Sequence, residues 1–218
     1  MSVSHVQGLC MKHVLSALAL AAVTMGAQAQ VSFSGGVDRV DLNGYNPNGS
    51  AGLFSPTPVG GREDSAISST GGNLTATFLG FEALHSDTFT FSLGSGTLTN
   101  KGPLHASISG LVGAGLLDFT FRDTADGTSV GNGQGLGDYT SYAVLGSFSS
   151  GTFVPYTMGG TYDLILGFND GARVDADYDD MVVGLKVTPV PEPETYALML
   201  AGLGALGFVS RRRKARAS

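Results

Sequence analysis

Between residues 31 and 187 the chain alternates short runs of β-branched and aromatic residues with clusters of Gly, Ser, Asn and Asp. Runs of this kind, bounded by turn-forming residues, are typical of strands, and no helical apolar spacing competes with them. The sequence therefore predicts an all-β fold, an antiparallel β-sandwich or jelly roll. Strands are expected at residues 31–33, 37–42, 74–81, 88–93, 105–111, 116–122, 141–148, 162–168 and 181–187.

The first 29 residues have the layout of a secretory signal peptide. A short basic stretch precedes an apolar core at residues 14–25, and Ala27 and Ala29 form the small-x-small pattern of a cleavage site. We expect a signal helix at residues 1–29 that is cleaved after Ala29. A complete signal also begins at Met11, which is a candidate for the true start. The chain is therefore expected to be exported.

The rest of the sequence divides into three parts. Residues 30–72 are rich in Gly, Pro and Ser and are expected to form strands and loops. Residues 73–188 carry the clearer strand pattern of the sandwich, and residues 189–218 form a separate C-terminal segment. Residues 30–188 are called the passenger below. The single cysteine, Cys10, lies in the expected signal, so the passenger must be held together by core packing, with or without bound metal.

Charge is distributed unevenly along the chain. Residues 31–190 hold six Lys or Arg against sixteen Asp or Glu, whereas the last eight residues hold five Lys or Arg. A passenger this acidic has no basic surface for nucleic acid or anionic lipid. We therefore expect no nucleic-acid partner, and the passenger is better suited to binding cations or to staying soluble.

The C-terminal segment has three parts in a fixed order: a Pro-Glu-Pro stretch, an apolar run at residues 196–209, and a basic tail. Proline neither continues a strand nor fits inside a helix, so the Pro-Glu-Pro stretch ends the passenger and exposes an extended segment to a processing enzyme. The residues expected to direct sorting and processing are Pro191, Glu192, Pro193, Arg211, Arg212 and Arg213.

The apolar run is expected to form a C-terminal transmembrane helix. Its fourteen residues would span about 21 Å as a helix, against a hydrocarbon core of about 30 Å. The flanks favour a membrane location, because Tyr196 suits one interface and the basic tail can remain in the cytoplasm at the other. We therefore expect an inner-membrane intermediate, anchored or transient, with the passenger outside.

This ordered layout, at about residues 190–215, resembles the PEP-CTERM sorting signal. The small-residue pattern Ala-Gly-Leu-Gly-Ala at residues 201–205 adds to the resemblance. The PEP-CTERM family is processed by an exosortase, a membrane protease, in Gram-negative bacteria that make exopolysaccharide. The resemblance implies an exosortase as partner and a final location at the cell surface or outside the cell. It also implies extracellular polysaccharide as a second partner.

The last expected hairpin of the passenger, at residues 162–187, contains its largest concentration of ionisable side chains. Six carboxylates between residues 163 and 180 would repel one another, and calcium, which binds carboxylate and carbonyl oxygens, would relieve that repulsion. A solvated acidic turn without metal is the alternative. Residues 73–187 also resemble uncharacterised β-rich domains in which an acidic box precedes the final strand. The candidate calcium ligands are Asp170, Asp175, Asp177, Asp179 and Asp180.

The sequence does not favour an enzyme. A G-x-S-x-G match at residues 127–131 is followed by a glycine loop instead of a helix. Nothing pairs the passenger's two histidines with a nucleophile, and the absence of Trp argues against a cleft that stacks on sugars. The main hypothesis is a structural or binding component of the extracellular polysaccharide matrix. The alternative is a secreted carbohydrate-active enzyme that uses passenger aspartates.

Overall fold

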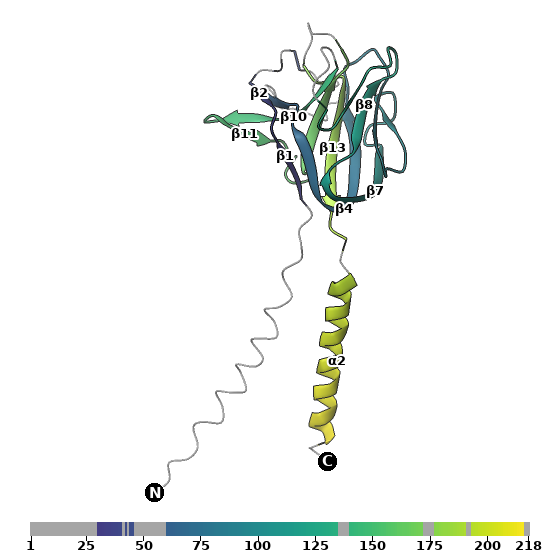
Figure 1. Cartoon of the computed structure of the whole chain (residues 1–218), viewed down its shortest axis with the longest axis vertical. Helices are drawn as coiled ribbons and strands as arrows, with labels where there is room; N and C mark the ends of the chain where they lie inside the picture. Colours follow the sequence, from purple (N-terminus) through teal and green to yellow (C-terminus); the bar gives the residue numbers. More distant parts are fainter. Residues whose placement is uncertain are drawn as a thin grey trace. The chain divides into compact units, whose positions relative to one another are not determined.

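The computed structural model describes residues 30–40, 42, 44–45, 60–134, 140–171, 177–190 and 193–215 (Figure 1). The chain forms two compact units, Ala29–Val190 and a second unit that contains the C-terminal helix. The expected signal peptide, with its cleavage residues Ala27 and Ala29, lies outside the described residues, as do Asp175, Pro191 and Glu192.

The described part of the passenger contains thirteen strands, and their pairings are antiparallel, which confirms the all-β class. In strands such as β5 and β8 buried residues alternate with more exposed ones, as a sheet with one buried face requires. The strands are β1 (Val31–Ser34), β2 (Val37–Arg39), β3 (Gly60–Glu63), β4 (Ala66–Gly80), β5 (Asp87–Phe91), β6 (Leu98–Thr99), β7 (Ser107–Leu116), β8 (Phe119–Asp123), β9 (Ser129–Gly131), β10 (Ser141–Ser149), β11 (Thr152–Pro155), β12 (Leu164–Asn169) and β13 (Met181–Thr188).

The larger sheet has nine strands in the order β1-β4-β13-β12-β10-β3-β2, with β7 paired to β4 and β11 paired to β10. Its longest strand, β4, pairs with β1 near its start and with β13 along its second half. Two glycines with positive φ, Gly71 and Gly72, lie between these pairings. A Cβ atom at Gly72 would lie 2.4 Å from the carbonyl oxygen of Thr188, so only glycine lets β13 end this close to β4.

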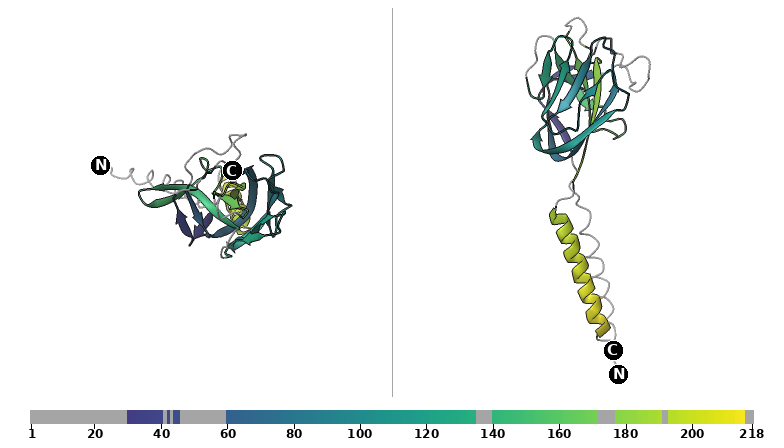
Figure 2. Two further views of the ribbon diagram at one scale, coloured as in Figure 1. Left: turned by 90° about the horizontal axis from the view of Figure 1, so that it is seen from above. Right: turned by 90° about the vertical axis from the view of Figure 1, so that its right-hand side faces the viewer.

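The smaller sheet has four strands in the order β6-β5-β8-β9 and shares one apolar core with the larger sheet (Figure 2). Phe89 and Phe121 point inward from β5 and β8 because they occupy alternate positions of their strands. The ring of Phe121 stacks on Phe168 of β12, with ring centroids 5.0 Å apart and an interplanar angle of 6°. The two sheets therefore pack against each other through aromatic side chains.

A second apolar cluster covers the other face of the larger sheet. It contains Leu145, Ile165 and Val182 from β10, β12 and β13, together with Tyr45 and Tyr178 from outside the strands. Every residue of β12 is buried, as expected for a strand covered on both faces. The segment 177–180, which holds much of the predicted acidic loop, is thus part of a packed layer.

The helix α2 (Pro193–Ala215) has 23 residues and begins at a proline, a residue favoured in the first turn of a helix. Its described apolar side chains are exposed. Across the described ranges, no helix combines the length and apolar character needed to span a membrane. This finding corrects the predicted transmembrane helix. The physical reason is that the apolar run has only fourteen residues, and α2 extends beyond it into charged sequence at both ends.

Candidate metal centre

Antiparallel pairing brings distant acidic residues together at one set of strand ends. Asp87, the first residue of β5, lies opposite Asp123, the last residue of β8. In the larger sheet, Phe168 near the end of β12 pairs with Met181 at the start of β13. The next residue of β13, Val182, pairs with the end of β4. The connections that follow β4 and β12 therefore start at this same edge, and they carry further ionisable side chains.

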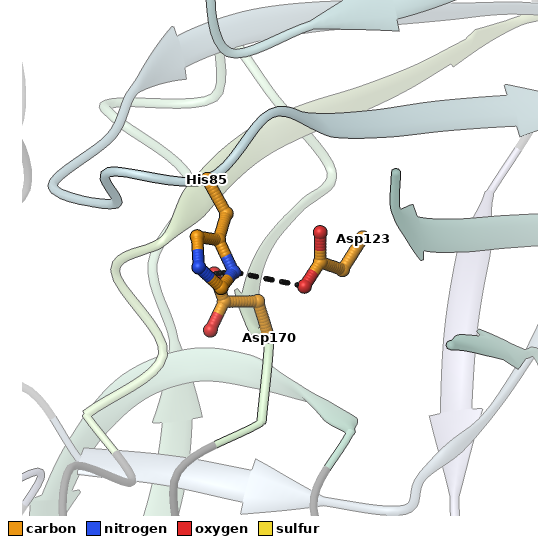
Figure 3. A group of neighbouring side chains, drawn as sticks. All are labelled: His85, Asp123 and Asp170. Atoms are coloured by element: carbon orange, nitrogen blue, oxygen red, sulfur yellow. Dashed lines mark hydrogen bonds and ion pairs between the residues drawn. The ribbon is translucent and has the colours of Figure 1, made fainter. Parts of the chain in front are cut away.

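The first group of potential ligands combines an imidazole with two carboxylates. His85, Asp123 and Asp170 offer one ligand atom each, all within 4.8 Å of one another. Nδ1 of His85 lies 3.0 Å from Oδ2 of Asp123 and 3.6 Å from Oδ2 of Asp170. Figure 3 shows the three side chains converging from separate segments of the chain. We call them the imidazole group.

The members of the imidazole group differ in exposure. The side chain of Asp123 is buried, that of Asp170 is mostly buried, and that of His85 is 53% exposed. The hydrogen bond between His85 and Asp123 raises the pKa of the imidazole, and the nearby charge of Asp170 adds to that effect. The backbone N–H of Ala125 donates to Oδ1 of Asp123 at 2.7 Å and fixes that carboxylate. The two carboxylates of the imidazole group therefore lie largely inside the protein, whereas its imidazole lies at the surface.

Asp87 lies next to this group and is completely buried. Its Oδ2 accepts a hydrogen bond of 2.7 Å from Nδ2 of Asn100, but its Oδ1 is buried without a hydrogen-bond partner. Burial, followed by the charges of Asp170, Asp180 and Asp123, raises the pKa of Asp87 to about 8. One oxygen of Asp87 is therefore buried without a hydrogen-bond donor, which is unfavourable unless another group stabilises it.

Asn100 links three of the segments around Asp87. Its Oδ1 accepts from the backbone N–H of Asp87 at 3.0 Å, and its Nδ2 also donates to the carbonyl oxygen of His85 at 3.1 Å. A longer contact of 3.4 Å joins Nδ2 to the carbonyl oxygen of Asp180. The side chain of Asn100 is buried. Through these contacts it connects β5, the loop at His85 and the residue before β13.

The second group of potential ligands is formed by the carboxylates of Glu82, Asp179 and Asp180, called the carboxylate group below. The backbone N–H of Glu82 donates to the carbonyl oxygen of Asp179 at 2.9 Å, which holds the two segments together. Burial raises the pKa of Asp180 to about 7, and the charges of Asp170, Asp179 and Glu82 contribute. Oδ2 of Asp180 accepts from the backbone N–H of Asp170 at 2.8 Å, so the two groups are neighbours.

Asp177 belongs to neither group within the described residues. It is buried beside Tyr178, whose hydroxyl donates to Oε1 of Glu63 at 2.5 Å, and Arg39 binds the same carboxylate at 2.7 Å. A Cβ atom at Gly167 would lie 2.2 Å from the carbonyl oxygen of Tyr178, so this segment lies directly on β12. The buried tyrosine therefore anchors the acidic segment to the sheet.

The structure thus divides the predicted calcium ligands among different surroundings. It places Asp170 in the imidazole group, places Asp179 and Asp180 in the carboxylate group, and separates Asp177 from both. Sequence reasoning missed the partners that come from other parts of the chain, which are Glu82, His85, Asp87 and Asp123.

A strand-periodicity signal could have identified two of these missed residues. Asp87 shares the inward face of β5 with Phe89 and Phe91, and Asp123 shares that of β8 with its two phenylalanines. An aspartate in register with core phenylalanines is expected to be buried. Glu82 and His85 lie in a connection between strands and carry no such signal.

The C-terminal segment gives the clearest relation to known proteins. Residues 189–214 match the PEP-CTERM protein-sorting motif. The PEP-CTERM motif starts directly after the last residue of β13, Thr188, and includes most of α2. It marks the chain as an exported protein that an exosortase processes and that passes through the membrane to the cell surface or beyond. No curated protein and no solved structure matches the chain.

Proposed function

We propose that this protein is a structural or binding component of the extracellular polysaccharide matrix, carried by a non-enzymatic β-sandwich passenger. The observation that carries the proposal is the PEP-CTERM motif at residues 189–214, which marks an exosortase substrate. Two packed antiparallel sheets with a continuous aromatic core support a stable domain outside the cell. The predicted N-terminal signal peptide is consistent with this route.

We further propose that calcium binds at the carboxylate group. Glu82, Asp179 and Asp180 supply oxygen ligands within 4.8 Å of one another, and calcium binds carboxylate oxygens. The charge of the passenger gives calcium a second role wherever the polysaccharide carries acid groups, because two negatively charged polymers repel each other. A divalent cation would reduce that repulsion and allow the protein to adhere.

Calcium is expected to stabilise the passenger against heat. If the dissociation constant is about 0.1 mM, as in extracellular modules, calcium at about 10 mM adds about 2–3 kcal/mol to the free energy of unfolding. The melting temperature should then rise by about 5–10 °C. Asp180→Asn should remove most of this increase, whereas Asp118→Asn, at an exposed aspartate before β8, should retain it. A melting temperature that calcium leaves unchanged in the wild-type protein would contradict the calcium proposal.

The matrix role predicts reversible binding to polysaccharide. Purified protein should co-sediment with exopolysaccharide from a producing strain, and removal of calcium should release it without any increase in reducing ends. An increase in reducing ends would favour the carbohydrate-active enzyme. The burial of Asp87 removes this one residue as a candidate for that alternative, because a completely buried carboxyl group cannot reach a glycosidic oxygen. Absence of binding under both conditions would contradict the matrix-binding role.

A further inference from the structure

The imidazole group has a different ligand chemistry from the carboxylate group. It offers a nitrogen, Nδ1 of His85, beside the carboxylate oxygens of Asp123 and Asp170. Calcium binds oxygen ligands, whereas imidazole nitrogen together with carboxylate oxygen suits zinc and related transition metals. The nature of the donors therefore separates this site from the calcium site proposed above.

The spacing of the donor atoms fits one small cation. Zinc lies about 2.0–2.2 Å from nitrogen and oxygen ligands, which places neighbouring ligands of a tetrahedral ion about 3.4 Å apart. Nδ1 of His85 lies 3.0 Å from Oδ2 of Asp123 and 3.6 Å from Oδ2 of Asp170. Shifts of a few tenths of an ångström would bring Nδ1 of His85 to the tetrahedral spacing from each of the two carboxylate oxygens.

Asp87 provides an independent indication that a cation binds beside it. Its side chain is completely buried, and Oδ1 has no hydrogen-bond partner. Because Asp87 lies directly opposite Asp123 in the β5–β8 pair, both side chains project from the same face of the small sheet. This buried oxygen of Asp87 has no hydrogen-bond donor and lies beside two further carboxylates and an imidazole. A bound cation would stabilise it there.

The surroundings hold these ligands in place. Asn100 fixes the second oxygen of Asp87 and the backbone carbonyl of His85, and the backbone N–H of Ala125 fixes Asp123. Such supporting contacts orient metal ligands and raise affinity. The exposed imidazole of His85 leaves a route for an ion and a coordination position open to solvent. We propose that His85, Asp123 and Asp170 bind a divalent transition-metal ion, whose charge the neighbouring buried Asp87 balances, with zinc as the test case.

The test uses the purified full-length protein, stripped of metal with a chelator and titrated separately with zinc chloride and calcium chloride in a calorimeter. Wild-type protein should bind one zinc ion at this site. His85→Ala and Asp87→Asn should each weaken zinc binding about tenfold or more, whereas Asp118→Asn should bind zinc as the wild type does. Calcium binding should change little in His85→Ala, because the carboxylate group remains intact.

A second measurement separates an effect on the metal site from a structural effect. In metal-free protein at neutral pH, Asp87→Asn should leave the melting temperature nearly unchanged, because the amide has the size of the carboxyl group and its oxygen can accept the same hydrogen bond from Asn100. The same substitution should reduce the rise in melting temperature that zinc causes. The proposal is overturned if zinc does not bind the wild-type protein, or if it binds His85→Ala and Asp87→Asn as tightly as Asp118→Asn. Loss of calcium binding alone would instead contradict the proposed function and leave the zinc site standing.

Discussion

Replacing Pro191, Glu192 and Pro193 together with alanine is expected to leave the exported protein uncut, with its basic tail still attached. Proline restricts the backbone to extended conformations before it and cannot be accommodated inside a helix. Three alanines, the strongest helix formers, would let α2 extend from residue 193 back toward the end of β13. The extended segment that an exosortase is expected to recognise would then be lost.

Intact mass spectrometry of protein from the cell envelope and the culture medium checks this prediction. Wild-type protein should lack the tail that contains Arg213, and the triple-alanine variant should retain it. Pro103→Ala, in the connection between β6 and β7, is the matched control and should be processed as the wild type is. Normal processing of the triple variant would show that the Pro-Glu-Pro stretch is dispensable, and a wild-type protein that retains Arg213 would show that no cleavage occurs there.

Phe121→Ala is expected to cost about 3–5 kcal/mol of the free energy of unfolding. Phe121 is completely buried and contacts aromatic rings in both sheets, with its ring centroid 4.8 Å from that of Phe89 and 5.0 Å from that of Phe168. Its removal leaves a cavity where the two sheets meet. Because small domains are stable by only about 5–15 kcal/mol, this loss removes a substantial share of the free energy of unfolding.

Urea denaturation followed by far-ultraviolet circular dichroism measures the effect, since the chain has no tryptophan to report unfolding. Phe208→Ala is the matched control, because this phenylalanine is 61% exposed on α2 and lies outside the passenger. Phe121→Leu should recover part of the loss by filling part of the cavity. A cost below about 1 kcal/mol for Phe121→Ala would mean that the two sheets do not depend on this contact.

Much of the strand content could be predicted from the sequence. The expected hairpin at residues 162–187 is confirmed by the pairing of β12 with β13, and β8 and β10 lie close to their expected positions. Short strands such as β6 and β9 were missed, because two or three residues carry no measurable period. The start of β4 was missed because the Ser, Thr and Gly residues at 68–72 are typical of turns. In the structure these residues belong to a strand, because they pair with β1 and β7.

The candidate site could be predicted only in part. The acidic segment was found because its charges lie close together in the sequence, and Asp170, Asp179 and Asp180 do lie in the two groups of neighbouring side chains, although calcium binding stays a prediction. The partners from β8 and from the connection after β4 depend on which strands pair, and local patterns do not encode that pairing. Asp177 lies outside both groups because the neighbouring Tyr178 is buried against the larger sheet, and no pattern in the acidic segment indicated that burial.

The position of β13 in the larger sheet affects the order in which the passenger can assemble. β13 is the last strand of the chain, yet it lies between β4 and β12, and its final residue contacts Asn73, 115 residues earlier. During export from the N-terminus, β4 and β12 therefore present unpaired edges until the final strand arrives, and such edges pair readily with other chains. Contacts between such distant residues also form slowly. The sorting motif begins at the residue after β13, so exosortase processing of the tag follows the export of this last strand.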